Sequence, residues 1–258
     1  MSDLTTTLPR YVVLGNGVVA ERFLEAMLSR HYLPEEVFLN APAKQRNTAG
    51  IRAVCGSAIA VRDWSDAART ALLKRARKTH DLWLLSIYFG HILDGDVLAA
   101  VDGRGVNMHP GLLPWCRGSH TNVWPIVERS PAGVTLHAMV AEVDAGPVLV
   151  QREVPVRPWD TAASLYTRLE DAAVGLLEEA WPRAVLDRWP GSPQGPGGSY
   201  HAVRDLARLD KVDLDESLEA RTFFDTLRAR SFAPHPGVVL TVDGKRVEAT
   251  IVLKEAPR

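Results

Sequence analysis

Residues 82–86 read Leu-Trp-Leu-Leu-Ser and residues 105–108 read Gly-Val-Asn-Met, with a helical pattern at 97–101 between them. Each outer run is short and mostly apolar, which is typical of a buried strand. A strand, a helix and a second strand in succession favour parallel pairing, because the helix carries the chain back to the edge where it started. This stretch therefore predicts the centre of an α/β domain.

The same rhythm continues toward the N-terminus. Residues 11–14 and 36–40 form two further apolar runs, and helical patterns occur at 18–29 and 67–77. The second helical pattern follows the capping stretch Asp63-Trp64-Ser65-Asp66, whose side chains suit a helix start. The first half of the chain is thus predicted to form a Rossmann-like, mostly parallel sheet flanked by helices.

Toward the C-terminus the pattern changes. Residues 133–140 and 148–154 alternate in polarity with a period of two, and the loop 141–147 is long enough to reverse the chain. We therefore expect two more strands on the same sheet, with antiparallel pairing. Apolar residues at helical spacing over 161–186 predict a long amphipathic helix that covers one face of the sheet.

The chain is expected to divide into a main α/β domain at residues 1–188, a linker at 189–199 and a small module at 200–258. The linker is dense in Pro and Gly. In the last part, 214–230 is predicted to be helical and 238–253 to be a β-hairpin around Asp243-Gly244. The fold class is thus α/β with a C-terminal helix-plus-β-hairpin module.

Composition argues against several functional classes. The 258 residues are 46% hydrophobic and 24% charged, and the formal net charge is −1, so no overall field favours nucleic acid or a membrane. The two cysteines, Cys55 and Cys116, are far apart and indicate neither a metal site nor a disulfide framework. The first ten residues are too polar for a signal peptide, and no apolar run is long enough to span a bilayer. We expect a soluble cytoplasmic protein.

Asn107 and His109 lie two residues apart at the end of a predicted strand. In an extended chain they share one face, roughly 6–7 Å apart at the backbone, at the edge of the sheet where α/β enzymes place their chemistry. An amide that stabilises an oxyanion beside an imidazole that moves a proton suits acyl transfer to an amine. Asp144, in the loop between the two later strands, is the candidate carboxylate to orient His109.

Gly15-Asn16-Gly17 is a weak indication of dinucleotide binding. With Ala20 it matches the dinucleotide pattern G-x-G-x-x-A, yet the next strand ends in Asn40 where an acidic residue would bind the ribose. Nicotinamide binding is therefore disfavoured. Close approach of the Gly15 and Asn16 backbone to a substrate phosphate, or simply a tight turn, is the preferred interpretation.

Four other residues are open to a chemical interpretation that their surroundings do not favour. His137 has the opposite parity to Val134 and Leu136 on its strand, so we interpret it as structural or exposed. Ser119-His120 lacks the G-x-S-x-G elbow of a hydrolase. Cys116 is not expected to be a nucleophile.

At this point the sequence resembles a known family. The pattern N-x-H-P-G-L-L-P-x-x-R-G at 107–118, followed by V-D-A-G-P-V-L at 143–149, is similar to that of the folate-dependent formyltransferases. The resemblance implies Asn107, His109 and Asp144 as catalytic residues, N10-formyltetrahydrofolate as donor, and no metal. It places the folate against Ser86, Ile87, Tyr88, Phe89 and, on the other side, Val140. Arg117 and Trp124 are expected to contact substrate, although core packing is the more usual role of such a Trp.

The sequence of the last sixty or so residues indicates which amine accepts the formyl group. Tyr200-His201, the acidic stretch 213–215 and the segment 227–232 resemble the enzymes that formylate nucleotide-linked amino sugars, and their terminal hairpin implies a homodimer. We expect a dTDP-linked amino-deoxysugar. Methionyl-tRNA is disfavoured because the last part of the chain is short and balanced in charge. Hydroxyornithine or another amino-acid-derived amine, hydrolysis of the formyl-folate, and a non-catalytic folate- or nucleotide-binding protein stay open as alternatives.

Overall fold

The computed structural model describes residues 9–215 and 217–255, so the polar N-terminal segment lies outside the described residues. The described chain forms two compact units, which interleave along the sequence. Unit 1 contains the described residues up to His109 together with Thr135–Gln151 and Ala173–Gln194; unit 2 contains Pro110–Val134, Arg152–Ala172 and the described residues from Gly195 onward. The division predicted from the sequence, at residues 1–188, 189–199 and 200–258, stays a prediction.

The central feature is a sheet that, among the described residues, has seven strands in the order β3-β2-β1-β4-β5-β7-β8. The strands are β1 (Tyr11–Gly15), β2 (Glu36–Leu39), β3 (Ala60–Asp63), β4 (Trp83–Ile87), β5 (Gly105–His109), β7 (Gly133–Ala138) and β8 (Val148–Glu153). The first five pair in parallel, and β5 pairs with β7 antiparallel. The predicted mostly parallel sheet with an antiparallel extension is confirmed.

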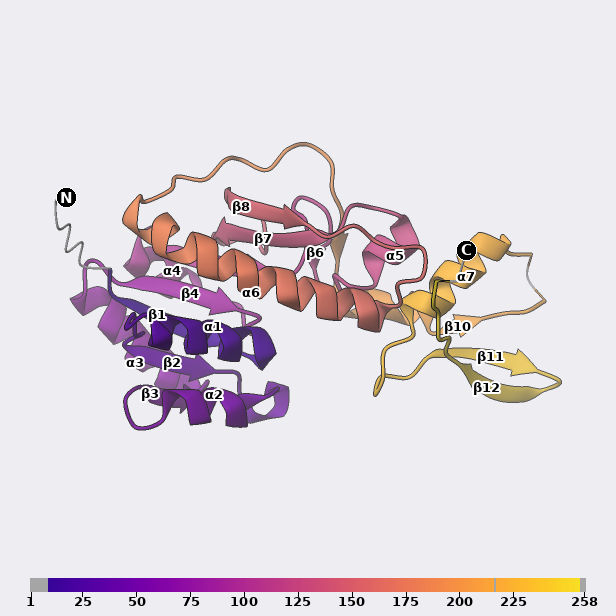
Figure 1. Cartoon of the computed structure of the whole chain (residues 1–258), viewed down its shortest axis with the longest axis horizontal. Coiled ribbons are helices and arrows are strands. Elements are labelled where there is room, and N and C mark those ends of the chain that lie inside the picture. Colours follow the sequence, from indigo (N-terminus) through magenta and orange to yellow (C-terminus); the bar gives the residue numbers. More distant parts are fainter. Residues whose placement is uncertain (1–8, 216, 256–258) are drawn as a thin grey trace. The chain divides into compact units, whose positions relative to one another are not determined.

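Helices cover both faces of this sheet. On one face lie α1 (Gly17–Ser29), α2 (Thr48–Cys55) and the part of α6 (Ala162–Leu186) that belongs to unit 1, from Ala173 onward, and on the other α3 (Asp66–Lys78) and α4 (Gly95–Val101) (Figure 1). The ring of Trp181 in α6 packs against Tyr11 and Trp83, with ring centroids 5.4 and 6.3 Å apart. The predicted cap of α3 is present, because Ser65 Oγ accepts a hydrogen bond from Ala68 N at 3.2 Å.

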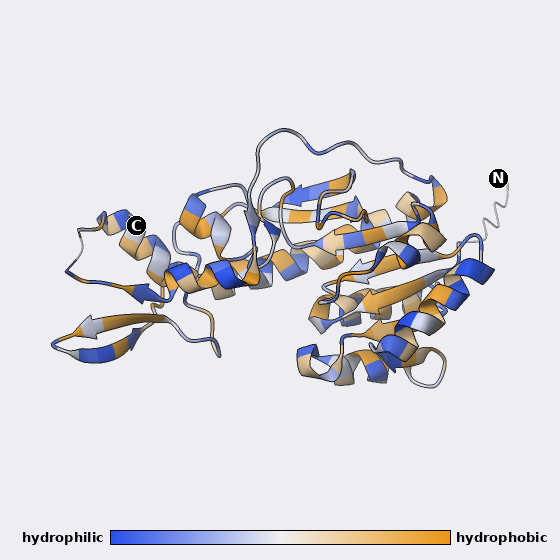
Figure 2. Cartoon of the chain, turned by 180° about the vertical axis from the view of Figure 1, so that it is seen from behind, coloured by the Kyte–Doolittle hydropathy of each residue, from blue (hydrophilic) through white to orange (hydrophobic). Residues whose placement is uncertain are grey.

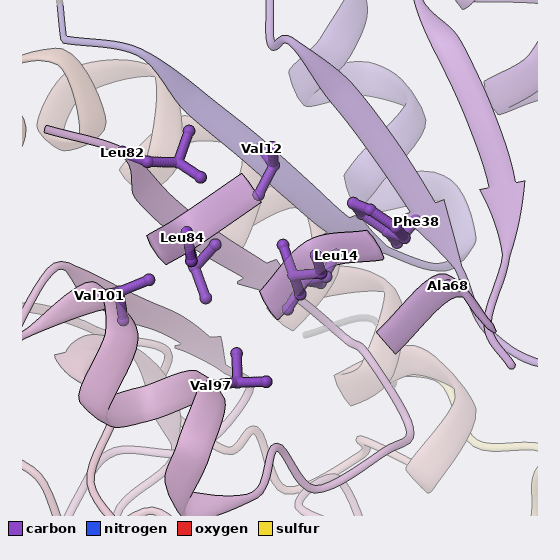
Figure 3. Close-up of a cluster of buried hydrophobic side chains, with 10 residues drawn as sticks. Val12, Leu14, Phe38, Ala68, Leu82, Leu84, Val97 and Val101 are labelled. Atoms are coloured by element: carbon purple, nitrogen blue, oxygen red, sulfur yellow. The ribbon is translucent and has the colours of Figure 1, made fainter. Parts of the chain in front are cut away.

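The core under α3 and α4 explains the apolar runs of the sequence. Figure 3 shows side chains of β1 and of the 82–84 segment facing Val97 and Val101 of α4. All of these side chains are fully or almost fully buried, and each contributes roughly 1.5–3 kcal/mol by leaving water. Figure 2 shows the same strands as hydrophobic along their length, as expected for strands buried on both faces.

Two elements of unit 1 were not predicted, α2 and β3. Strand β3 reads Ala-Val-Arg-Asp and is largely exposed, so it lacks the apolar run that marks a strand. Among the described residues it is an edge strand that pairs with β2, and its register brings Arg62 beside Phe38. Edge position rather than burial places these residues in the sheet.

Unit 2 contains short elements and the hairpin. They are β6 (Arg117–Gly118), α5 (Trp124–Glu128), β9 (Tyr200–His201), η2 (Val203–Leu209), β10 (Lys211–Val212), α7 (Ala220–Ala229), β11 (Val238–Val242) and β12 (Lys245–Ala249). The hairpin is confirmed: Asp243 and Gly244 have φ values of 49° and 74°, as a tight turn between antiparallel strands requires.

The predicted helix at 214–230 is wrong in its first part. Helix α7 begins only at Ala220, because the preceding acidic stretch forms a turn in which Asp215 N donates to Asp213 Oδ1 at 2.9 Å. Asp side chains bond their own neighbouring backbone in this way and compete with helix formation.

Candidate active site

Strand β5 presents Asn107 and His109 at its carboxyl end. The antiparallel register pairs Asn107 with His137 and His109 with Thr135 on β7. Directly paired residues of antiparallel strands point to the same face, so the odd-numbered residues of β5 and β7 form one polar surface. On the other side of β5, Asn107 is paired with Ser86 of β4.

Asp144 reaches this surface from the loop between β7 and β8. Its backbone is in the left-handed region, with φ of 53°. Two residues later Gly146 approaches β7 so closely that a Cβ there would lie 1.8 Å from Ala138 O. Gln194 holds the loop from outside: its Nε2 donates to Asp144 O at 2.7 Å and to Gly146 O at 3.0 Å.

The expected catalytic residues are brought together. His109 Nδ1 lies 3.4 Å from Asp144 Oδ2, and Asn107 Nδ2 lies 3.4 Å from Asp144 Oδ1. The His109 side chain is 4% exposed and the Asp144 side chain 10% exposed. The carboxylate thus faces the Nδ1 side of the His109 ring, as a carboxylate that orients an imidazole would.

His137 joins this cluster, and the sequence interpretation undervalued it. Its Nε2 lies 3.1 Å from Asn107 Nδ2 and 3.5 Å from Asp144 Oδ1. Its Nδ1 lies 2.9 Å from Ala138 O, and since a carbonyl only accepts, Nδ1 carries the proton and Nε2 accepts from the amide. The residue is 2% exposed, so the suggestion of an exposed His137 is wrong. The pairing of 107 with 137 was the missing signal.

The expected folate residues lie in the loop that leaves β4 and in the loop that leaves β7. Ser86 and Ile87 end β4, and both are buried, Ile87 completely. Tyr88 follows with φ of 54°, and Phe89 packs on Trp64 with ring centroids 5.1 Å apart. Val140 is 42% exposed. Of the five, Phe89 and Val140 offer apolar side-chain surface, whereas Ile87 can take part only through its backbone.

Gly15 and Asn16 form the turn between β1 and α1. Asn16 N donates to Ile87 O at 3.1 Å, and Asn16 Oδ1 accepts from Arg46 N at 2.8 Å. The buried Asn16 side chain therefore binds the chain itself, which favours the tight-turn interpretation of this motif for the side chain. A backbone contact with substrate stays a prediction.

Arg117 and Trp124 belong to unit 2. Arg117 lies on β6, whose partner strand β9 carries Tyr200 and His201. Trp124 is 4% exposed and stacks on the His201 ring with centroids 3.9 Å apart and an interplanar angle of 10°. His201 Nε2 is in turn 2.8 Å from Glu128 Oε1. The Trp124 ring thus packs inside unit 2, and the substrate contacts of both residues stay predictions.

Cys116 fits the inert role expected of it. It is 1% exposed, and burial raises the pKa of its thiol to about 11. A thiol with this pKa is protonated at neutral pH and is a poor nucleophile.

The cluster combines an amide donor, a buried imidazole and a carboxylate at the carboxyl edge of a mostly parallel sheet. Such a set can stabilise an oxyanion, accept a proton from an amine and stabilise the resulting imidazolium. These capabilities suit acyl transfer to an amine. Within residues 9–215 and 217–255, no group of His, Cys, Asp and Glu has the arrangement of a metal site.

Comparison with known proteins identifies the family. Residues 37–181 match the family described as Formyl transferase, and residues 205–255 match the N-formyltransferase dimerization C-terminal domain. The chain therefore belongs to the formyl transferase family, and the resemblance carried by 107–118 and 143–149 is confirmed.

Individual proteins that this chain is similar to are also formyltransferases. The dTDP-4-amino-4,6-dideoxyglucose formyltransferases of Mycobacterium bovis and Mycobacterium tuberculosis are 30% identical over 158 residues, which is 60% of this chain and 68% of theirs. A sugar N-formyltransferase from Shewanella sp. has the same fold, with a TM-score of 0.81, 22% identity and coverage of 96% of this chain and 99% of that one.

A third relative was solved with its ligands. The formyltransferase of Anoxybacillus kamchatkensis, in complex with UDP-4,6-dideoxy-4-formamido-L-AltNAc and tetrahydrofolate, is 29% identical with a TM-score of 0.53. The match covers 67% of this chain and 88% of the Anoxybacillus chain.

In the part of the present chain that the structure describes, no helix has the length and hydrophobicity needed to cross a bilayer.

Proposed function

We propose that this protein transfers a formyl group from N10-formyltetrahydrofolate to the amino group of a nucleotide-linked amino-deoxysugar. The observation that carries the proposal is the contact of Asn107 and His109 with Asp144, each at 3.4 Å, in a member of the formyl transferase family. The relatives named for amino-sugar substrates support this choice of acceptor.

Each side chain has a defined task in this reaction. His109 Nε2 accepts the proton that the amine loses as its nitrogen bonds to the formyl carbon. Asp144, beside Nδ1, stabilises the imidazolium, which returns the proton to N10 of the departing tetrahydrofolate. Asn107 donates an N–H to the formyl oxygen while negative charge develops there. The formyl carbon leaves one nitrogen and joins another, so no oxidant or metal is needed.

His137 determines which N–H of Asn107 does this work. One amide hydrogen is directed to His137 Nε2 at 3.1 Å, and the other points toward Asp144 at the longer distance of 3.4 Å. The second, weaker contact is the one that can be exchanged for the formyl oxygen. His137 is thus a positioning residue for the oxyanion donor.

The residues around β4 suit a flat aromatic ligand such as a pterin. Phe89, Leu93 and Met139 pack against one core cluster, and their neighbours Ile92 and Val140 are 78% and 42% exposed. Exposed apolar side chains on a well-packed base are typical of a ligand site. The folate is therefore assigned to the loops that contain Ser86–Phe89 and Val140.

For the nucleotide we propose dTDP, following the mycobacterial relatives, with UDP as the competitor named by the Anoxybacillus structure. Gly15, Asn16 and Arg117 are the proposed acceptor contacts. The protein is proposed to act as a homodimer, since residues 205–255 match a dimerization domain and the hairpin within it exposes Val242 and Val247.

A mass-spectrometric acceptor screen tests the function. The purified protein is incubated with N10-formyltetrahydrofolate and dTDP- or UDP-linked 3-amino- and 4-amino-6-deoxysugars, hydroxyornithine or methionyl-tRNA. We expect one formyl mass increment on a dTDP-linked sugar, and much less of this product in the same time with the Asn107→Ala protein. If only hydroxyornithine or only methionyl-tRNA is formylated, the proposed sugar acceptor is wrong. Release of formate without any formylated amine would indicate a hydrolase.

A further inference from the structure

Three loops at the carboxyl end of the sheet are joined through Asn40, the residue at which a dinucleotide-binding protein would carry an acid. Asn40 is 2% exposed. Its Oδ1 accepts from Gly90 N at 2.8 Å, and its Nδ2 donates to Lys44 O at 3.1 Å. Lys44 O also lies 3.4 Å from Asn16 Nδ2. The loops after β1, β2 and β4 are therefore held by one set of amide hydrogen bonds.

His91 makes a second connection between two of these loops, those after β2 and β4. Its Nε2 accepts a hydrogen bond from Ala41 N at 3.2 Å, and the Lys44 ammonium donates to Gly90 O at 3.1 Å. The ring packs on Phe89, with centroids 5.2 Å apart, and on Trp64 at 6.0 Å. Because a backbone N–H only donates, His91 is neutral in this arrangement, with its proton on Nδ1.

We propose that Asn40 and His91 are positioning residues that hold the loop after β4, residues 88–91, in the shape that binds the folate donor. This inference rests on the proposed function, which assigns the folate to that loop. It gives Asn40 a task that a ribose-binding acid would not perform, because a carboxylate has no N–H to donate to Lys44 O. Gly90 fits the same arrangement, since a Cβ there would lie 3.1 Å from Asn40 Nδ2.

The His91 connection depends on pH. Burial first, and the nearby Lys44 ammonium second, lower the pKa of His91 below that of a free imidazole. Other charges near this region are already paired: Asp63 with Gln45 and Arg52, and Asp94 with Arg69. Protonation of Nε2 removes the acceptor for Ala41 N–H. The loop is therefore held at pH values above the His91 pKa and released as the pH falls through it.

Amide hydrogen exchange of the free protein tests the connection without any ligand. Asn40→Ala and His91→Ala should increase exchange of residues 88–91 severalfold at pH 8, whereas His91→Asn, whose amide oxygen can accept, should do so less. The matched control is His80→Asn, an exposed histidine before β4. Equal exchange at 88–91 in Asn40→Ala, His91→Ala and the control would refute the connection, whatever the protein binds.

Titration with 5-formyltetrahydrofolate between pH 5.5 and pH 8 tests the link to the donor. We expect the affinity of the unmodified protein and of His80→Asn to fall toward acid pH, the profile of His91→Asn to be flatter, and His91→Ala to bind about tenfold more weakly at pH 8. kcat at saturating donor should change little. If His91→Asn keeps the full pH profile and His91→Ala binds normally, the inference is wrong. If the unmodified protein binds no folate at any pH, the proposed function and this donor assignment fail together, while the exchange experiment still decides the connection itself.

Discussion

Asn107 has two amide hydrogens and three groups that compete for them: His137, Asp144 and, in the proposed reaction, the formyl oxygen. The amide cannot satisfy all three at once. Its shorter bond to His137 fixes the plane of the amide, and its longer contact to Asp144 is the one open to exchange. Pre-orientation of this kind lowers the reorganisation needed as charge develops on the oxygen.

Asn107→Ala and His109→Ala are each expected to lower kcat by about 10²–10⁴-fold, because a donor to the oxyanion or the proton acceptor is lost. Steady-state kinetics with the sugar acceptor measure the effect, and circular dichroism melting verifies that the variants fold. Activity within threefold of the unmodified protein in either variant would contradict the assigned roles.

His137→Ala should lower kcat by roughly 10–100-fold with little change in KM for either substrate, since the amide of Asn107 loses its fixed orientation. His137→Gln, which offers an amide oxygen as acceptor, should recover part of the loss. Equal losses in the two variants would indicate that the imidazole does more than hold Asn107.

At this scale the sequence predicted which residues come together in the candidate site, apart from His137, but not the hydrogen bonds between them. The motif at 107–118 identified Asn107 and His109, and the second motif identified Asp144. His137 escaped because its importance depends on which residue of β5 it opposes, and register across two antiparallel strands is fixed by the sheet rather than by local sequence.

The loop between β7 and β8 is the element that places Asp144. Gly146→Ala would put a methyl group against Ala138 O, where a Cβ would be 1.8 Å away. We expect a loss of about 1–3 kcal/mol in the free energy of unfolding and a larger fall in activity, because the loop must move outward and take Asp144 with it. Urea denaturation and kcat measure the two effects.

The control for this change is Gly95→Ala at the start of α4, where a Cβ meets nothing within 4 Å. It should leave activity unchanged and stability equal or slightly higher. A Gly146→Ala protein as active as this control would show that Asp144 does not depend on the close approach.

Among the elements, the buried strands and the long helix were predictable, because buried positions require apolar residues and these form a clear pattern in the sequence. Strand β3 was not, since an edge strand needs few apolar residues. The helix α7 was predicted too long because Asp213 offers the backbone a turn that apolar periodicity does not reveal.

For the whole molecule, the hairpin of β11 and β12 carries the proposed dimer contact. Val247 lies opposite Leu240 on one face, while Arg246 and Thr241 share the other. Val247→Asp should place an unpaired carboxylate in the interface and give a monomer in sedimentation velocity experiments. Arg246→Ala, on the opposite face, should remain dimeric. A monomeric unmodified protein would contradict the proposal.

The two units interleave along the chain, and no local sequence pattern indicates this. Composition located the Pro- and Gly-rich stretch 189–199 correctly as irregular, but not what it contacts. Val148 forms an antiparallel bridge with Ser192, and Arg117 N donates to Ser199 O at 2.9 Å. These contacts join residues distant in sequence, which no local pattern encodes.

The two hydrogen bonds of Gln194 have a practical meaning for attempts to isolate a minimal enzyme. A chain shortened to residue 188 would keep Asn107, His109, His137 and Asp144, yet it would lose the amide that binds Asp144 O and Gly146 O. Proteolytic cleavage just before Gln194 would have the same result in the full chain if the freed end drifted away. The Pro- and Gly-rich stretch that looks dispensable thus helps to hold Asp144 in place. A shortened chain that is to be active should therefore extend past Gln194.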